Sequence, residues 1–213
     1  TVNTARFPQS LTSLTNVSKG EDFKQRLYFG KLTGYVSDED TVNLIGYLRR
    51  EDNLGDIAGN ALPSHGRRLL TEQDRYQLQW RHNAGDFLNQ FNIAFDKAVQ
   101  ETPSVEPGPE LVLLNPGNPD NVAFSEGIVA GGHFFEQGDN QKTWTIKNDS
   151  TLRMGQHTLK FGGQYVHLKL SRTVINGFLG RYYFANPCPN VTTGPACTAA
   201  FDFATAQPIQ AKI

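Results

Sequence analysis

The two cysteines, Cys188 and Cys197, are the residues with the clearest capacity for chemistry. They bracket a short segment rich in Pro, Gly, Asn and Thr, a composition that favours a turn bringing its two ends together. We therefore expect a disulfide between them, which would indicate an oxidising compartment. The alternative is two unrelated thiols. A zinc site is disfavoured, because two sulfurs leave a tetrahedral site incomplete and no histidine lies near them in the sequence.

Other side chains that could support catalysis or metal binding form no recognisable pattern. Ser125 lacks the Gly-x-Ser-x-Gly context of an activated serine. Residues 115–121 are dense in oxygen ligands, but without the regular spacing and closing Glu of a calcium loop a solvated turn is favoured. No histidine has metal-ligand spacing to another His, Cys or carboxylate. The histidines are His65, His82, His133, His157 and His167. We therefore expect no enzyme, no cofactor and no metal.

The composition fits a β protein better than a helical one. The chain contains 14 Phe, 7 Tyr, 20 Gly and 11 Pro but 1 Met, and its formal net charge is −1. This charge balance gives no basic footprint, so nucleic acid is not an expected partner. The mean hydropathy of −0.45 does not exclude a membrane barrel, because each barrel strand alternates lipid-facing and water-facing residues. No apolar run approaches the ~18 residues of a spanning helix.

The clearest structural pattern is the alternation over residues 75–81, which predicts a strand with two unlike faces. One face would carry Tyr76, Leu78 and Trp80, and the other Arg75, Gln77, Gln79 and Arg81. The second set is too charged for a soluble core and must face water. The first set must therefore face something apolar.

This strand opens the first of three predicted hairpins with long arms. The second arm follows a short turn at 82–86 and adds four residues to the apolar face: Phe87, Phe91, Ile93 and Phe95. Similar hairpins pair 23–36 with 41–50 and 144–152 with 158–170. Arms of about ten residues match a tilted crossing of a bilayer, whereas strands in soluble proteins average about five or six. The further lipid-facing residues would be Phe91, Ile93, Phe95, Leu159, Phe161 and Tyr165, and the further lumen-facing residues Lys147, Asp149 and Lys160. An ordinary solvated strand face is the alternative for the lumen set.

The connections between the hairpins are long, at 54–70 and 103–139, and rich in Gly and Pro. Short turns at one end and long loops at the other are typical of outer-membrane barrels, with the turns periplasmic and the loops extracellular. The prediction is therefore all-β: an antiparallel transmembrane β-barrel segment with about six spanning strands. It has residues 1–21 as an extracellular loop or linker and 22–172 as the barrel segment. Residues 173–213 would be an extracellular loop region with the disulfide and the start of a further barrel strand.

The long loops carry two smaller expectations. Short strands near 111–114 and 128–130 would lie inside the second loop without crossing the membrane. Arg67 and Arg68 lie in the first loop, where a solubilising charge pair is favoured over contact with lipopolysaccharide phosphates or an anionic ligand.

Two motifs resemble a known family. Residues 27–33, followed by 37–41, are similar to the opening barrel hairpins of TonB-dependent receptors. Residues 155–165, Gly-Gln-His-Thr-Leu-Lys-Phe-Gly-Gly-Gln-Tyr, resemble the G-x-H-x-L-K-F-G-x-x-Y hairpin of the same barrels, especially in the Oar-like group. The resemblance covers about residues 22–185. It implies a 22-stranded barrel in the bacterial outer membrane, filled by an N-terminal plug domain. Such receptors bind scarce nutrients outside and import them with energy passed by TonB.

Six strands cannot close a barrel that needs at least eight, so we expect an internal fragment of such a receptor. Its expected partners are outer-membrane lipid, the plug domain and remaining barrel strands, TonB through the plug, and an unknown nutrient. One alternative is a non-transporting outer-membrane barrel. Another is a soluble carbohydrate-binding β-sandwich, which would need shorter strands and a second covering sheet. The motifs do not report on the ligand, whose specificity would lie in the loops and the plug.

Overall fold

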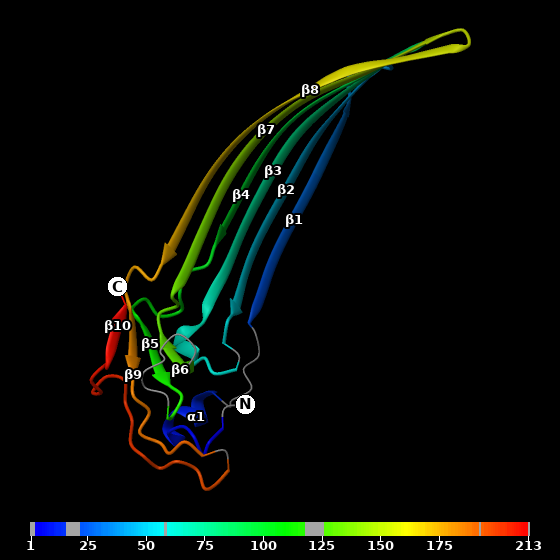
Figure 1. Ribbon diagram of the computed structural model, residues 1–213. Helices are drawn as coiled ribbons and strands as arrows, with labels where there is room; N and C mark the ends of the chain where they lie inside the picture. Colours follow the sequence, from blue (N-terminus) through cyan, green and yellow to red (C-terminus); the bar gives the residue numbers. More distant parts are fainter. Residues whose placement is uncertain (1–2, 16–21, 58, 118–125, 192, 213) are drawn as a thin grey trace.

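The computed structural model describes residues 3–15, 22–57, 59–117, 126–191 and 193–212 (Figure 1). It contains two sheets: a six-stranded sheet in the order β1-β2-β3-β4-β7-β8 and a four-stranded sheet in the order β10-β9-β5-β6. The predicted all-β, antiparallel fold class is confirmed. In the described parts of the chain, no helix is both long enough and apolar enough to cross a membrane.

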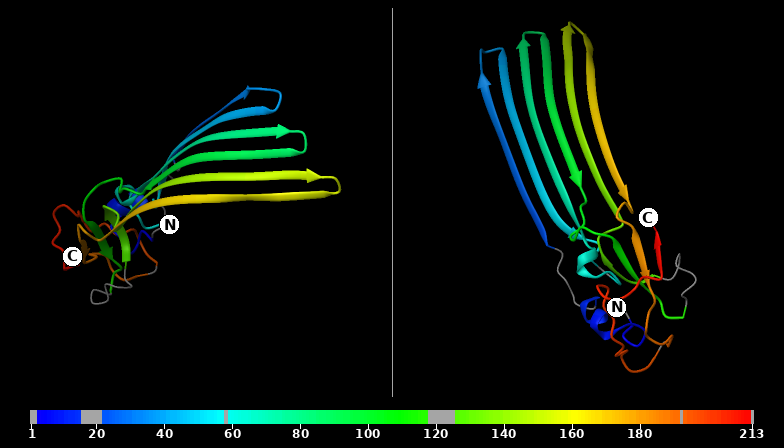
Figure 2. Two further views of the ribbon diagram at one scale, coloured as in Figure 1. Left: turned by 90° about the horizontal axis from the view of Figure 1, so that it is seen from above. Right: turned by 90° about the vertical axis from the view of Figure 1, so that its left-hand side faces the viewer.

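The large sheet is built from three hairpins whose neighbouring strands pair in continuous antiparallel register. Short turns join each pair of strands at one end, and longer connections leave from the other end (Figure 2). The sheet curves but does not close, so β1 and β8 are its edges. Its strands are β1 (Phe23–Tyr35), β2 (Asp40–Gly55), β3 (Arg67–Ala84), β4 (Phe87–Glu101), β7 (Phe135–Met154) and β8 (His157–Asn176).

The strands extend further toward the loop end than the sequence pattern predicts. The loop expected at 54–70 is reduced to residues 56–66, and β7 begins at Phe135 instead of near residue 144. In this region both faces of the sheet carry polar side chains, so the alternation that marks a strand is lost. Cross-strand ion pairs hold it instead, including Arg50 with Asp74 at 2.5 Å.

A small domain lies at the loop end of the large sheet (Figure 1). It contains β5 (Glu110–Leu114), β6 (Glu126–Gly131), β9 (Arg181–Phe184), β10 (Gln210–Lys212), the 3-10 helix η1 (Pro63–His65) and α1 (Gln9–Thr15). β5 pairs antiparallel with β6 and parallel with β9, which confirms the short strands predicted near 111–114 and 128–130. Its core is formed by Phe7, Leu11, Leu62, Leu113, Ile128, Ala130 and Phe184, with Leu111, Tyr182, Phe201, Phe203 and Ala206 packed against it.

Both ends of the described chain differ from the prediction. Residues 1–21 are not simply a loop or linker, because α1 forms within them and buries Leu11 in the small domain. Near the other end, β10 pairs with β9 and does not begin a further strand of the large sheet. Phe201 and Phe203 pack edge-to-face on Phe184, with ring centroids 6.1 and 5.2 Å away. Tertiary packing of these apolar residues overrides the loop composition around them.

The hydrophobic core of the described chain lies almost entirely in the small domain. In the large sheet, Ala94 is the one buried apolar residue among those described. Large side chains elsewhere in that sheet stay open, with Tyr76, Phe161 and Tyr165 53%, 53% and 62% exposed. Long strands with an uncovered apolar face are the main feature that any function must explain.

Candidate functional site: the two faces of the large sheet and the domain at its loop end

The register of the large sheet places every predicted lipid-facing residue on one face. Directly paired residues of antiparallel strands point to the same side of a sheet. Tyr76 is paired with Phe95, and Phe95 with Trp144, so an aromatic row crosses three strands. The set on this apolar face is Tyr76, Leu78, Trp80, Phe91, Ile93, Phe95, Leu159, Phe161 and Tyr165. Contact of this face with lipid stays a prediction.

The opposite face carries every residue predicted to face a lumen. Its side chains form a polar network, with Lys147 and Asp149 2.6 Å apart and the Gln77 amide donating to Oδ1 of Asn92 at 2.7 Å. A groove of about 380 Å³ opens on this face between Gln79, Arg81, Gln90 and Asp149, among others. The predicted set is Arg75, Gln77, Gln79, Arg81, Lys147, Asp149 and Lys160. Guanidinium, ammonium and amide groups on this face could bind polar groups of a solute or of a second domain; a water-filled lumen stays a prediction.

The apolar face has a defined length along each strand. On β4 it runs from Phe87 to Phe95, and on β7 from Trp144 to Leu152. Each stretch spans nine residues, which fits the ~9–11 residues of a strand that crosses a bilayer at a tilt. The strands themselves are 15 and 20 residues long. About half of β7 therefore extends beyond the apolar band, toward the loops.

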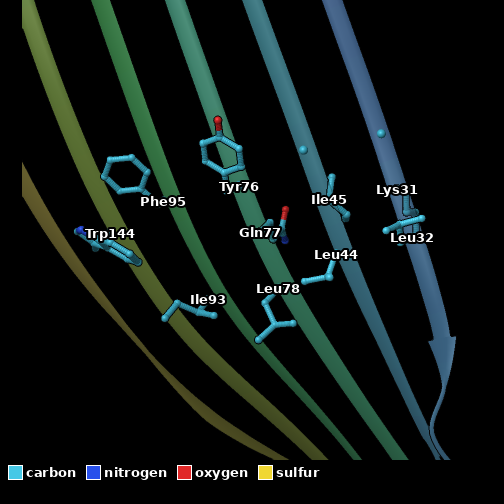
Figure 3. A pocket seen from close by; sticks show the side chains of 12 residues that line it. Lys31, Leu32, Leu44, Ile45, Tyr76, Gln77, Leu78, Ile93, Phe95 and Trp144 are labelled. Atoms are coloured by element: carbon cyan, nitrogen blue, oxygen red, sulfur yellow. The ribbon is translucent and has the colours of Figure 1, made fainter.

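A shallow groove of about 590 Å³ lies on the apolar face near its loop end (Figure 3). It forms where Gly30 and Gly46, a directly paired couple on β1 and β2, leave the surface low. A Cβ added at either glycine would meet no atom within 4 Å. Apolar side chains from five neighbouring strands surround it: Leu32, Leu44, Tyr76, Leu78, Ile93, Phe95 and Trp144. An extended apolar chain would fit this lining chemically.

The turn end of the apolar face is marked by a polar cluster. Trp80 donates from its indole N–H to a carboxylate oxygen of Asp40 at 2.8 Å, and His82 contacts the same oxygen through Nδ1 at 2.9 Å. Ser37, in the turn between β1 and β2, donates to the other Asp40 oxygen at 2.8 Å. An indole with its ring on an apolar surface and its N–H bound to a polar group is the arrangement found at membrane–water interfaces.

At the loop end of the apolar band both edge strands place apolar residues on the polar face, although β1 also keeps Tyr28 on the apolar face. Phe29 of β1 and Leu168 of β8 lie on the polar face, in the same cross-strand row as Arg75. One row nearer the loops, Leu27 and Leu170 repeat this arrangement. Simple alternation did not predict this, since it assigns one character to each face along the whole strand.

The predicted disulfide is present between Cys188 and Cys197. Both cysteines are buried beneath the segment that carries α1. The backbone N–H of Cys197 donates to the carbonyl of Thr4 at 2.9 Å, and its carbonyl accepts from the N–H of Gln9 at 3.0 Å. Asn186 adds a hydrogen bond from its side chain to the carbonyl of Arg6 at 3.0 Å. The closed loop therefore fastens the N-terminal segment to the small domain.

Sequence spacing missed a histidine pair at the junction of the two sheets. His65 and His133 stack with ring centroids 4.6 Å apart, although 67 other residues separate them in sequence. Nε2 of His65 lies 3.5 Å from Glu110, a buried carboxylate that also pairs with Arg181. Burial, with the positive charge of the neighbouring His133, lowers the pKa of His65 to about 4. The His65 ring is therefore neutral near pH 7. Burial also lowers the pKa of His133, and the stacking of the two rings joins η1 to the segment before β7.

The arginines predicted as a solubilising pair instead make specific ion pairs. Arg67 contacts Asp56 at 2.5 Å and donates to the carbonyl of Phe135 at 2.9 Å. Arg68 pairs with Asp52 on the neighbouring strand β2. These contacts hold the start of β3 at the junction. Of the candidate calcium segment 115–121, residues 118–121 lie outside the described residues.

Comparison with known proteins identifies a structure with a similar fold. No family model and no curated protein matches the chain. The outer membrane transporter YddB from Escherichia coli is similar in structure, with a TM-score of 0.56 and 12% sequence identity, over 85% of this chain and 23% of that chain. This chain has the fold of a segment of an outer-membrane transporter barrel. It spans about a quarter of the length of that transporter, and at this identity the likeness is one of fold alone.

Proposed function

We propose that this chain is part of a TonB-dependent receptor in a bacterial outer membrane, which binds a nutrient outside and imports it into the periplasm. The observation that carries the proposal is the uncovered apolar face of the large sheet, with a polar face behind it. Only a non-aqueous surrounding makes such a face favourable, and a barrel wall has this two-sided character. In this proposal the protein moves its solute without changing it chemically, so it is not an enzyme.

The other features support the same arrangement. The edges β1 and β8 would pair with further strands of the barrel, because an open edge inside a bilayer leaves backbone groups unsatisfied. The polar face would line the lumen and contact a plug domain, through which TonB would act. The disulfide-closed small domain would stand on the extracellular side, where oxidising conditions preserve it. The receptor motifs at residues 27–41 and 155–165 favour the TonB-dependent class.

A soluble β-sandwich explains the structure less well. A sandwich covers the apolar face of one sheet with a second sheet. No described part of this chain covers the apolar face of the large sheet, and the four-stranded sheet packs at its end. A barrel that does not transport a solute would have the same wall, so an experiment is needed to distinguish it from a transporter.

The test is a growth comparison in the source bacterium with the gene intact, the gene deleted, or the tonB gene deleted. Each strain is supplied with single ferric siderophores, cobalamin or oligosaccharides as the limiting nutrient. A nutrient that requires both genes supports the proposal. A protein that forms a heat-modifiable outer-membrane barrel but is needed for none of these nutrients would favour the non-transporting barrel. A soluble protein recovered outside the membrane fraction would overturn both.

A further inference from the structure

We propose that the loop end of the apolar face binds a phosphorylated, multiply acylated glycolipid of the outer leaflet, with its phosphates on a row of three lysines. This inference rests on the proposed membrane location of the sheet. Lys97 is paired directly with Lys142, and Lys142 with Lys169, so the three lysines form one cross-strand row on β4, β7 and β8. The register puts them on the apolar face, outside any lumen.

The position of the lysine row relative to the aromatic row points to a headgroup. Lys97 follows Phe95 by two residues, and Lys142 precedes Trp144 by two residues. Two residues of a strand span roughly 7 Å. Aromatic side chains of this kind lie at the membrane–water interface. The ammonium groups therefore reach the layer just outside the hydrocarbon, where lipid phosphates lie.

The charge of this row is not balanced within the described chain. Lys97 contacts Glu72 at 3.3 Å. Among the described residues, no carboxylate lies within 4 Å of the ammonium group of Lys142 or Lys169, and both residues are exposed. Like charges placed directly opposite on neighbouring strands repel. A doubly charged phosphate group over the row would relieve that repulsion and bind strongly to it.

A lipid, in contrast to free phosphate, is indicated by the groove beside the row. Phe95 and Trp144 line this groove. The same two residues lie next to the lysine row, on its turn side. An acyl chain in the groove over Gly30 and Gly46 would place the attached headgroup at the level of the lysines. At the same level the edge strand β8 carries Lys169 on this face, while its apolar residues Leu168 and Leu170 lie on the other face. Three features on one level therefore mark a lipid boundary.

The test compares two triple variants of the full-length protein with the same change in charge. The first is Lys97→Gln/Lys142→Gln/Lys169→Gln, and the control, on the opposite face and outside the groove, is Lys147→Gln/Arg153→Gln/Lys160→Gln. Each protein in detergent is titrated with bisphosphorylated hexa-acyl lipid A, and bound lipid is counted by native mass spectrometry. Heat-modifiable migration in gels first confirms that each protein has formed its barrel.

We expect the first variant to bind lipid A at least tenfold more weakly and the control to bind as the wild type does. Monophosphorylated lipid A should bind the wild type more weakly, and inorganic phosphate at equal concentration should not displace lipid A. Equal binding by both variants, an equal loss in both, or displacement by inorganic phosphate would overturn the inference. A wild-type protein that forms no barrel in any lipid would instead contradict the proposed function, so the two failures are distinguishable.

Discussion

Phe95 and Trp144 lie directly opposite each other on β4 and β7, with ring centroids 4.9 Å apart and planes inclined at 45°. The pair stands at the loop end of the apolar face, and Trp80 stands near the turn end. If that face contacts lipid, the two tryptophans mark its two interfaces. Because the chain has 2 Trp, each can be studied alone.

Tryptophan fluorescence should locate both interfaces. In the full-length protein, the single variants Trp80→Phe and Trp144→Phe each remove one of this chain's two indoles and leave the other to be measured. In vesicles with brominated acyl chains, Trp144 and Trp80 should both be quenched most by bromine near the headgroups and least by bromine at the chain ends. Any tryptophans outside this segment are replaced in the background protein. Strongest quenching at the chain ends would place the rings at the bilayer centre and contradict this assignment.

A charge at the middle of the apolar face should prevent stable assembly. Leu78→Arg would place a guanidinium between Leu44 and Ile93, in the central row of the face. The expected cost is roughly 2–4 kcal/mol of unfolding free energy near the bilayer midplane. Urea titration of the protein folded in lipid vesicles measures it. Gln79→Arg, on the same strand but on the polar face, is the matched control and should change stability little. Similar values for the two variants would show that the assignment of faces is wrong.

Loss of the disulfide should destabilise the small domain while leaving the large sheet in place. Cys188→Ser/Cys197→Ser opens the loop to which the segment around α1 is hydrogen-bonded. The expected loss is about 2–4 kcal/mol for that domain, because the open loop gains freedom when unfolded. Limited proteolysis of intact cells should then cut near α1, while the heat-modifiable barrel persists. Unchanged protease resistance would contradict the structural role of the bond. Thiol labelling of the unreduced wild type should find neither cysteine.

Acid should weaken the junction between the two sheets. The pKa of His65 is about 4 in the folded protein and about 6.5 in the unfolded chain. Between these values the unfolded chain binds a proton that the folded protein does not, so stability falls as the pH drops from about 6.5 to 4 and is fully present above 6.5. The shift corresponds to a loss on the order of 2–3 kcal/mol at pH 4. Hydrogen exchange at pH 7 and pH 4.5 in the segments around η1 measures it.

The matched variant for this prediction is His65→Gln, which keeps a polar side chain but removes the titrating ring. It should be less stable at pH 7, because the stacking on His133 is lost. Its exchange rates should rise less between pH 7 and pH 4.5 than those of the wild type, after correction for intrinsic exchange. An identical rise in both proteins would assign the acid sensitivity to groups other than His65.

The sequence was most informative where a strand has two unlike faces. The alternation around Leu78 and Gln79 was sufficient to predict strands, hairpins and opposite faces, because side chains of a strand point alternately to its two sides. The sequence was also sufficient to predict the disulfide, since the loop between the cysteines is short and rich in turn residues. The same signal failed at the loop end, where stretches such as 67–74 and 135–143 lack regular alternation and resemble loops in their sequence.

What the tertiary structure alone decided are the relationships between residues distant in the chain. The row of Lys97, Lys142 and Lys169 depends on the register of three strands, and a shift of one residue would send its members to opposite faces. The stacking of His65 on His133, and the burial of Leu11 among strands more than 100 residues away, depend on packing of the small domain. The alternation of polar and apolar side chains follows from local strand geometry, so residues adjacent in the sequence are enough to reveal it. Register and packing result from the free energy of the whole chain, so no short segment specifies them.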